Sequence, residues 1–164
     1  MYERVLLAFD GTLEGGIALR EGAILARRCG AKVFLLSVVN DSGGVRVAES
    51  AYGGVVNELT EKSRQVLEAG VARLTALGMV PTAKLLAGEP VRVIGAYARE
   101  VKADLVVIGH HKHSMLERWW SGSTSAYLCD HIGCTVIIAR NAVSDTDFEA
   151  AMTKAAAVAP VVAA

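Results

Sequence analysis

The chain has no excess of charge of either sign, no long hydrophobic run and very little cysteine. Seventeen Lys and Arg balance seventeen Asp and Glu over 164 residues, so no long-range positive field favours nucleic acid or an anionic membrane surface. Although 52% of the residues are hydrophobic, no apolar run reaches the roughly 18 residues that a membrane-spanning helix needs. We therefore expect a soluble protein that binds neither nucleic acid nor membrane.

Cysteine is too scarce and too scattered to build a disulfide framework. The three cysteines, Cys29, Cys129 and Cys134, are an odd number spread along the chain, which fits a reducing compartment. The segment Met1–Asp10 lacks the charged, apolar and small-residue regions of a signal peptide. A cytoplasmic location is the resulting expectation.

Apolar, β-branched runs alternate with segments of helical periodicity along most of the chain. Strands are predicted over Arg4–Phe9, Lys32–Val39, Thr82–Ala87, Asp104–Ile108 and Thr135–Ala139. Helices are predicted over Leu13–Arg28 and Val56–Leu77, after the turn Gly88-Glu89-Pro90, and over Gly122–Ile132. Because crossovers between parallel strands are right-handed, this order predicts a single-domain, doubly wound, five-stranded parallel α/β sheet with helices on both faces.

The composition changes after the last predicted strand. Residues 1–141 carry the α/β pattern, and residues 142–164 form a tail rich in Ala and Val. The tail is either a loosely held helix over Phe148–Val158 or disordered, because Ala richness alone does not separate these states. No function is assigned to it.

The loop after the fourth predicted strand carries the most informative residues. Gly109 leaves that strand, and Gly122-Ser123-Thr124-Ser125 opens the next predicted helix. Small hydroxyl residues at a helix N-terminus leave backbone amides and the positive end of the helix dipole directed at an anion. In doubly wound sheets ligands bind at the carboxyl ends of the strands, so phosphate is the expected guest.

These residues resemble the universal stress protein family. Its nucleotide-binding members carry Gly, two residues, Gly, nine residues, then Gly-Ser or Gly-Thr, and Gly109, Gly122 and Ser123 match in spacing. The likeness extends over about the first 140 residues, through VLLAFDGT, Gly88-Glu89-Pro90, ADLVVIG and CTVIIARN.

The resemblance implies an adenine nucleotide alpha hydrolase-like fold and an ATP-type ligand, accompanied by Mg²⁺, in a stress-response or signalling role. The adenine is expected near the first and second strands, and the phosphates near the hydroxyl residues. Nucleotide contacts are thereby implied for Ala8, Asp10, Val38, Gly109, Lys112, Gly122, Ser123, Thr124 and Ser125.

Lys112 departs from the family pattern, because it stands where the second glycine is expected. Its side chain either occludes the close backbone approach that glycine permits or places its ammonium group over the phosphates. Two functions follow from these readings. The first is a nucleotide-binding protein, and the alternative is a dimeric protein-interaction module that has lost the ligand.

Several residues also have plainer interpretations. Asp10 caps a turn or the first helix about as readily as it contacts a ligand. Gly122-Ser123-Thr124 resembles an ordinary helix start until its spacing to Gly109 is considered. Trp119 and Trp120 either pack under their loop or face a partner or the nucleotide.

Metal binding and dedicated catalysis find little support in the sequence. Histidines at 110, 111 and 113 lack further ligands at suitable spacing, and Cys129, His131 and Cys134 are better explained by core packing. Neither GxxxxGK[ST] nor GxSxG occurs. Hydrolysis is expected to be slow at most, because no acid that would position a water is evident.

The last predicted strand, Thr135–Ala139, is expected at an edge of the sheet. An apolar edge strand exposes unpaired backbone groups unless it pairs with another chain. The family resemblance points the same way, so a homodimer through this strand is predicted.

Overall fold

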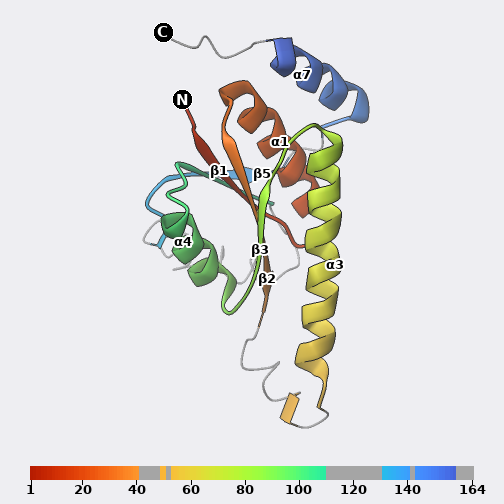
Figure 1. Ribbon diagram of the computed structural model, residues 1–164, viewed down its shortest axis with the longest axis vertical. Helices are drawn as coiled ribbons and strands as arrows, with labels where there is room; N and C mark the ends of the chain where they lie inside the picture. Colours follow the sequence, from red (N-terminus) through yellow and green to blue (C-terminus); the bar gives the residue numbers. More distant parts are fainter. Residues whose placement is uncertain (41–48, 51–52, 110–130, 141–142, 158–164) are drawn as a thin grey trace.

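The computed structural model describes residues 1–40, 49–50, 53–109, 131–140 and 143–157, and these form alternating strands and helices (Figure 1). In chain order the elements are β1 (Arg4–Ala8), α1 (Leu13–Cys29), β2 (Lys32–Val39), α3 (Val55–Ala76), β3 (Thr82–Ala87), α4 (Pro90–Glu100), β4 (Leu105–Gly109), β5 (Thr135–Ala139) and α7 (Asp145–Ala157). The predicted helix Gly122–Ile132 lies outside the described residues except at its last two positions.

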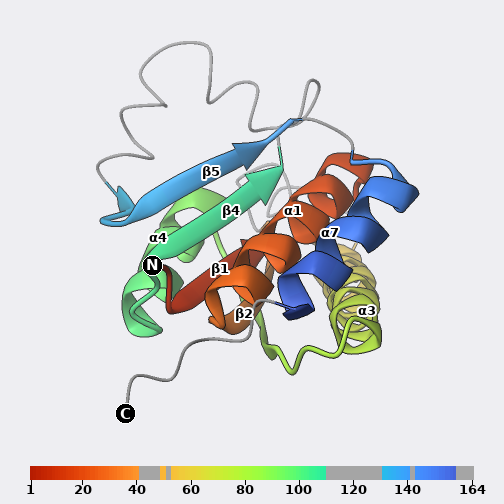
Figure 2. The same ribbon diagram turned by 90° about the horizontal axis from the view of Figure 1, so that it is seen from above.

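The five strands form one sheet in the order β3-β2-β1-β4-β5, and every neighbouring pair is parallel. Figure 2 shows α1, α3 and α7 on one face of the sheet and α4 on the other. The chain therefore has the predicted doubly wound α/β fold. Because β1 and β4 are neighbours, the strand order reverses between them.

Each face of the sheet has its own hydrophobic core. Leu7 and Leu35 face α1 and α3, whereas Leu6, Leu36 and Val106 face α4. All five side chains are at most 1% exposed. Burial on both faces explains why these strands are continuous apolar runs without a polar alternation.

The helices begin where side chains satisfy their first amides. The Thr12 hydroxyl accepts from the Gly15 amide at the start of α1, and Glu89 accepts from the amides of Val91 and Arg92 at the start of α4. Pro90 follows Glu89 in the first turn of α4, where the missing amide proton costs nothing. These caps fix the points at which the chain leaves the carboxyl ends of the strands.

Helix α7 packs on α1 beyond the last strand (Figures 1 and 2). Phe148 and Met152 are 8% and 7% exposed, and they cluster with Ile24 of α1. Arg20 donates a hydrogen bond to the carbonyl of Val143 and lies over the Phe148 ring. Of the two states considered for this segment, the structure has a packed helix over Asp145–Ala157.

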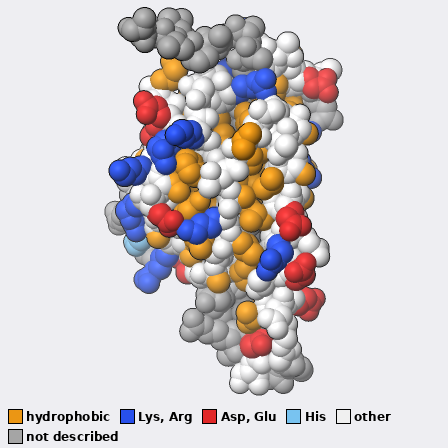
Figure 3. All heavy atoms as spheres, viewed as in Figure 1, with side chains coloured by type: hydrophobic (Ala, Val, Ile, Leu, Met, Phe, Trp, Pro, Cys, Tyr) orange, Lys and Arg blue, Asp and Glu red, His pale blue; other side chains and the backbone are white. Residues whose placement is uncertain are grey.

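The helices of the described chain include none that combines the length and apolar character needed to cross a bilayer. Figure 3 shows hydrophobic side chains gathered along the middle of the face over β3, with charged side chains on either side. Strand β3 is one edge of the sheet and β5 is the other.

Candidate functional site

The carboxyl ends of β1, β2 and β4 lie side by side at the point where the strand order reverses. Ala8 is the last residue of β1, Val38 is the next to last of β2, and Gly109 is the last of β4. Asp10 follows β1 by two residues. The fold therefore brings these four predicted site residues together at the carboxyl ends of the strands, called the carboxyl edge below. Doubly wound proteins bind their ligands at this edge.

Asp10 builds the turn between β1 and α1. Its Oδ1 accepts hydrogen bonds from the Thr12 amide at 3.1 Å and from the Thr12 hydroxyl at 2.6 Å. The hydroxyl oxygen in turn accepts from the Gly15 amide at 3.0 Å. Thr12, and not Asp10, is thus the residue that caps α1, while the exposed Asp10 carboxylate orders the turn that leads into it.

Ser37, on β2, is hydrogen-bonded to the backbone just before the β1–α1 turn. The sequence did not predict this role. The Phe9 amide donates to the Leu36 carbonyl at 2.9 Å, and the Ser37 hydroxyl donates to the Phe9 carbonyl at 2.7 Å. Ser37 is 2% exposed. These two bonds extend the pairing of β1 with β2 by one residue beyond Ala8. They therefore fix the position of the backbone just before Asp10. The sequence signal is a single hydroxyl residue among the apolar residues that follow Lys32 in β2.

The first turn of α1 approaches the end of β4 too closely for larger residues. A Cβ added at Gly109 would lie 2.5 Å from the Glu14 carbonyl oxygen, and one at Gly15 would lie 2.3 Å from Asp10 Oδ1. Gly109 therefore has a packing role on α1, independent of any ligand. Gly109 pairs with Ala139 of β5 and is therefore the last residue of β4. The sequence had predicted that the strand ends at Ile108 and that Gly109 begins the loop.

Ala8 and Val38 form the apolar part of this edge. Both are partly exposed and lie on the α4 side of the sheet, where they pack against the second core with Leu86 and Ile138. The carboxyl ends of the strands thus combine the apolar side chains of Ala8 and Val38 with the Asp10 carboxylate and the backbone of the β1–α1 turn. The remaining predicted contacts, Lys112, Gly122, Ser123, Thr124 and Ser125, lie outside the described residues.

The residues considered for a metal site are only partly described. Cys134 packs against the core on the α4 side, and burial, with a smaller contribution from the Asp104 charge, raises the pKa of its thiol. Among the described residues no group of three or more His, Cys, Asp and Glu could hold a metal ion. His110, His111, His113 and Cys129 lie outside them.

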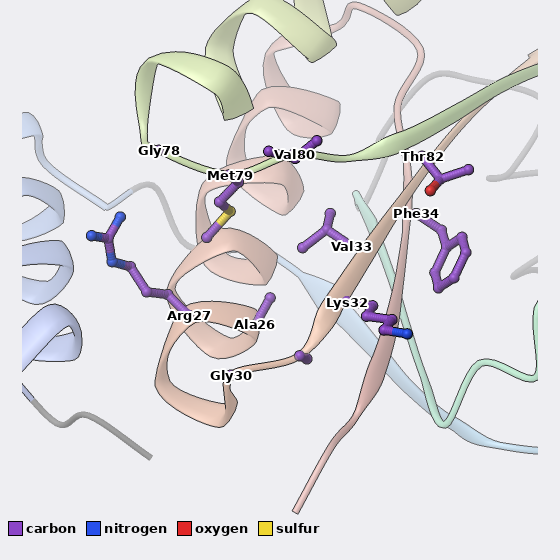
Figure 4. A pocket seen from close by; sticks show the side chains of 11 residues that line it. Ala26, Arg27, Gly30, Lys32, Val33, Phe34, Gly78, Met79, Val80 and Thr82 are labelled. Carbon is purple, nitrogen blue, oxygen red and sulfur yellow. The ribbon is translucent and has the colours of Figure 1, made fainter. Parts of the chain in front are cut away.

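A cavity of about 510 Å³ lies at the opposite, amino-terminal edge of the sheet. Its lining includes Lys32 and Thr82, the first residues of β2 and β3. Figure 4 shows Val33 and Met79 around the cavity, with Arg27 and Lys32 on opposite sides of it. This cavity is separate from the edge that carries Ala8, Val38 and Gly109.

The topology defines a doubly wound α/β protein whose candidate ligand site lies at the reversal of strand order. Residues 1–140 match the universal stress protein family. Because the match covers most of the 164 residues, the chain belongs to that family. Helix α7 lies beyond the matched segment.

Individual relatives agree with the family match. A putative universal stress protein of Staphylococcus aureus is 28% identical over 155 residues, covering 90% of each chain. The solved universal stress protein UspA of Lactobacillus plantarum superposes with a TM-score of 0.68 and 23% identity, covering 85% of this chain and 98% of that one.

Two further solved family members contain adenine nucleotides. The Archaeoglobus fulgidus protein in complex with dAMP has a TM-score of 0.59 and 23% identity, over 84% of this chain and 97% of that one. An Arabidopsis thaliana family protein with AMP bound has a TM-score of 0.58 and 18% identity, over 86% and 93%. At these identities the likeness establishes the fold alone.

Proposed function

We propose that this protein binds an adenine nucleotide of the ATP type, with Mg²⁺, at the carboxyl edge between β1 and β4. The observation that carries the proposal is the convergence of Ala8, Asp10, Val38 and Gly109 at the reversal of strand order. Family members solved with dAMP and AMP support an adenine nucleotide as the ligand. The family supports a cytoplasmic stress-response or signalling role.

The described residues fit a nucleotide base. Ala8 and Val38 offer partly exposed apolar side chains, and Asp10 offers a carboxylate on a turn fixed by Thr12 and Ser37. We assign the base to this group, with the ribose and phosphates beyond Gly109. Mg²⁺, when bound, neutralises phosphate charge.

The phosphate contacts of the proposal rest on sequence. Gly122, Ser123, Thr124 and Ser125 supply backbone amides and hydroxyl groups, and Lys112 supplies a positive charge over the phosphates. The nucleotide is retained or sensed, with slow hydrolysis at most. In the alternative, Lys112 fills the position of the lost glycine and the protein acts as a dimeric interaction module.

Isothermal titration with ATP separates the two functions. The protein is unfolded and refolded first to remove any nucleotide carried through purification, and the titration is done with and without Mg²⁺. We expect saturable micromolar binding that weakens about 10-fold in Ser123→Ala, since a hydrogen bond to a charged group contributes roughly 1.5–3 kcal/mol. Titrations with AMP and dAMP then measure what the additional phosphates contribute.

The matched control is Thr82→Ala, which removes an exposed hydroxyl at the amino-terminal end of β3, away from the proposed site. This substitution is expected to leave ATP affinity unchanged. Lys112→Gly distinguishes the two roles of the lysine. Its affinity for ATP falls if the ammonium group binds phosphate, and rises if the side chain blocks the site. No binding at millimolar ATP in the wild type would contradict the nucleotide proposal and favour the interaction module.

We also propose a homodimer through β5. Strand β5 is an outer strand of the sheet, and its sequence TVIIA contains no charged residue. The other outer strand, β3, carries Lys84, whose ammonium group pairs with Glu100 at 2.7 Å. Because a lysine on an edge strand discourages pairing between sheets, β5 is the edge suited to a second copy of the chain.

A further inference from the structure

A second cavity, of about 740 Å³, lies between α1, α3 and α7. Helix α1 contributes Gly16, Ile17 and Arg20, α3 contributes Arg73, and α7 contributes Phe148. All three helices lie on the same face of the sheet (Figure 2). The volume is in the range of small-molecule sites, roughly 300–1,000 Å³. Since the family match ends at residue 140, the wall formed by α7 is an addition to the matched part of the chain.

The lining combines apolar walls with positive charge. Leu13, Ile17, Leu77 and Phe148 line the cavity, and Leu13 is 79% exposed beside it. Among the described residues of the lining, the charged ones are both arginines, and none is Asp or Glu. An anion with an apolar body is the ligand that this combination suits, because the charge and the hydrocarbon both find complementary groups.

The two arginines have different surroundings. Arg20 is directed to α7, since it donates to the Val143 carbonyl at 3.3 Å and lies 5.2 Å from the centre of the Phe148 ring. Arg73 lies 5.7 Å from the centre of the Phe9 ring, and its Nη1 would be 3.6 Å from a Cβ added at Gly16. The guanidinium group of Arg73 therefore lies over α1 at the cavity.

Arg73 is the group best suited to meet an anion. Among the described residues it has no carboxylate within ion-pair distance, whereas Lys84 and Arg64 each have one. Its planar group offers several N–H donors in a fork that matches a carboxylate. Contact with the Phe9 ring and α1 restrains the side chain in advance, which lowers the entropy lost on binding.

We propose that this cavity binds a small amphipathic anion, a carboxylate carried on a short hydrocarbon chain. Arg73 pairs with the carboxylate, and Ile17, Leu77 and Phe148 contact the chain. The site is separate from the proposed nucleotide site, which lies at the strand ends beside Ala8. The cavity lining includes Gly11 and Thr12 of the β1–α1 turn, but not Asp10, which belongs to the proposed nucleotide site.

Titration of the full chain with octanoate tests the proposal, with octan-1-ol as an uncharged probe of similar length. We expect saturable octanoate binding below about 10 mM, the affinity range of a weak small ligand. In Arg73→Gln, octanoate affinity falls about 10-fold, because the charge-assisted hydrogen bond to the carboxylate is lost, and octan-1-ol affinity stays within about 2-fold. Arg64→Gln is the matched control, since Arg64 is exposed on the same helix outside the cavity, and it binds like the wild type.

Amide chemical shifts identify where the probe binds. Under the proposal, octanoate moves the amide signals of Gly16 and Ala76, which line the cavity, and leaves those of Val38 and Gly88 in place. Phe148→Ala weakens both octanoate and octan-1-ol, because it removes an apolar wall. The proposal is overturned by absence of saturable octanoate binding, by equal affinity in Arg73→Gln and the wild type, or by shifts centred on Ala8 and Val38. Thermal unfolding of each variant establishes that it is folded.

Discussion

Ser37 restrains the backbone that leads to Asp10 in the candidate site. Its hydroxyl is buried and donates to the Phe9 carbonyl, one residue before Asp10. In Ser37→Ala the carbonyl loses this donor in a buried place, which costs about 1–3 kcal/mol of unfolding free energy. The β1–α1 turn also loses a restraint. We expect ATP affinity to fall several-fold in isothermal titration, together with a lower midpoint of urea unfolding.

Thr60→Ala is the matched control for Ser37→Ala. The Thr60 hydroxyl also donates to a backbone carbonyl, that of Val56, at 2.7 Å, but this hydrogen bond is exposed to solvent on α3. Water replaces the lost partner there, so stability should change by no more than about 0.5 kcal/mol. Equal effects of the two substitutions would show that burial of the Ser37 hydrogen bond is unimportant.

The sequence identified Asp10 as a residue of a turn or cap but not the bonds that it makes. Asp10 is recognisable because turns and helix starts favour Asp. The division of roles, with Asp10 ordering the turn and Thr12 capping α1, depends on the path of the backbone. Ser37 is 28 residues from its acceptor, and no local pattern indicates a partner that distant.

The strands were the most predictable elements. Thr82–Ala87 and Thr135–Ala139 match the structure residue for residue, and Arg4–Phe9 extends one residue beyond β1. Buried parallel strands are continuous apolar runs bounded by turn residues, so their limits are visible in the sequence. The tail was harder, because its Ala-rich composition fits either helix or disorder. The signal was the pair Phe148 and Met152, four residues apart on one helical face.

Helix α7 is held by a small contact, and this sets the expected effect of Phe148→Ala. Phe148 belongs with Ile24 and Met152 to a small cluster that is separate from the two cores of the sheet, so we expect that α7 can undock without opening the sheet. The cost should therefore stay below the about 3–5 kcal/mol of a Phe→Ala change in a closed core. Hydrogen exchange is expected to show loss of protection in α7 with protection in β1 and β4 retained.

Thr153→Ala serves as the control on the same helix, since Thr153 is exposed and its hydroxyl bonds only to its own helix, at the Glu149 carbonyl. It should leave α7 protected. Simultaneous loss of protection in α7 and in the central strands of Phe148→Ala would instead mean that α7 unfolds with the whole domain. That outcome would contradict the view of α7 as a separately docked helix.

At the scale of the whole molecule, the two outer strands predict where copies of the chain meet. The Thr135 amide donates to the Asp104 carbonyl at 3.3 Å, and successive backbone amides of a strand point to opposite sides. Ile137 therefore faces β4, while the backbone groups of Val136 and Ile138 point away from the sheet. These outward groups are the ones that a second β5 strand would bond.

Proline substitutions distinguish the two sides of β5, because proline has no amide proton to donate. Val136→Pro removes an outward donor and is expected to convert the proposed dimer into a species near the 17.3 kDa of one chain in sedimentation, with modest loss of stability. Ile137→Pro removes a bond to β4 and should lower the unfolding temperature much more. A wild-type protein that sediments as one chain, or a Val136→Pro variant that remains a dimer, would exclude β5 as the interface and leave the opposite edge, at β3, as the next strand to test.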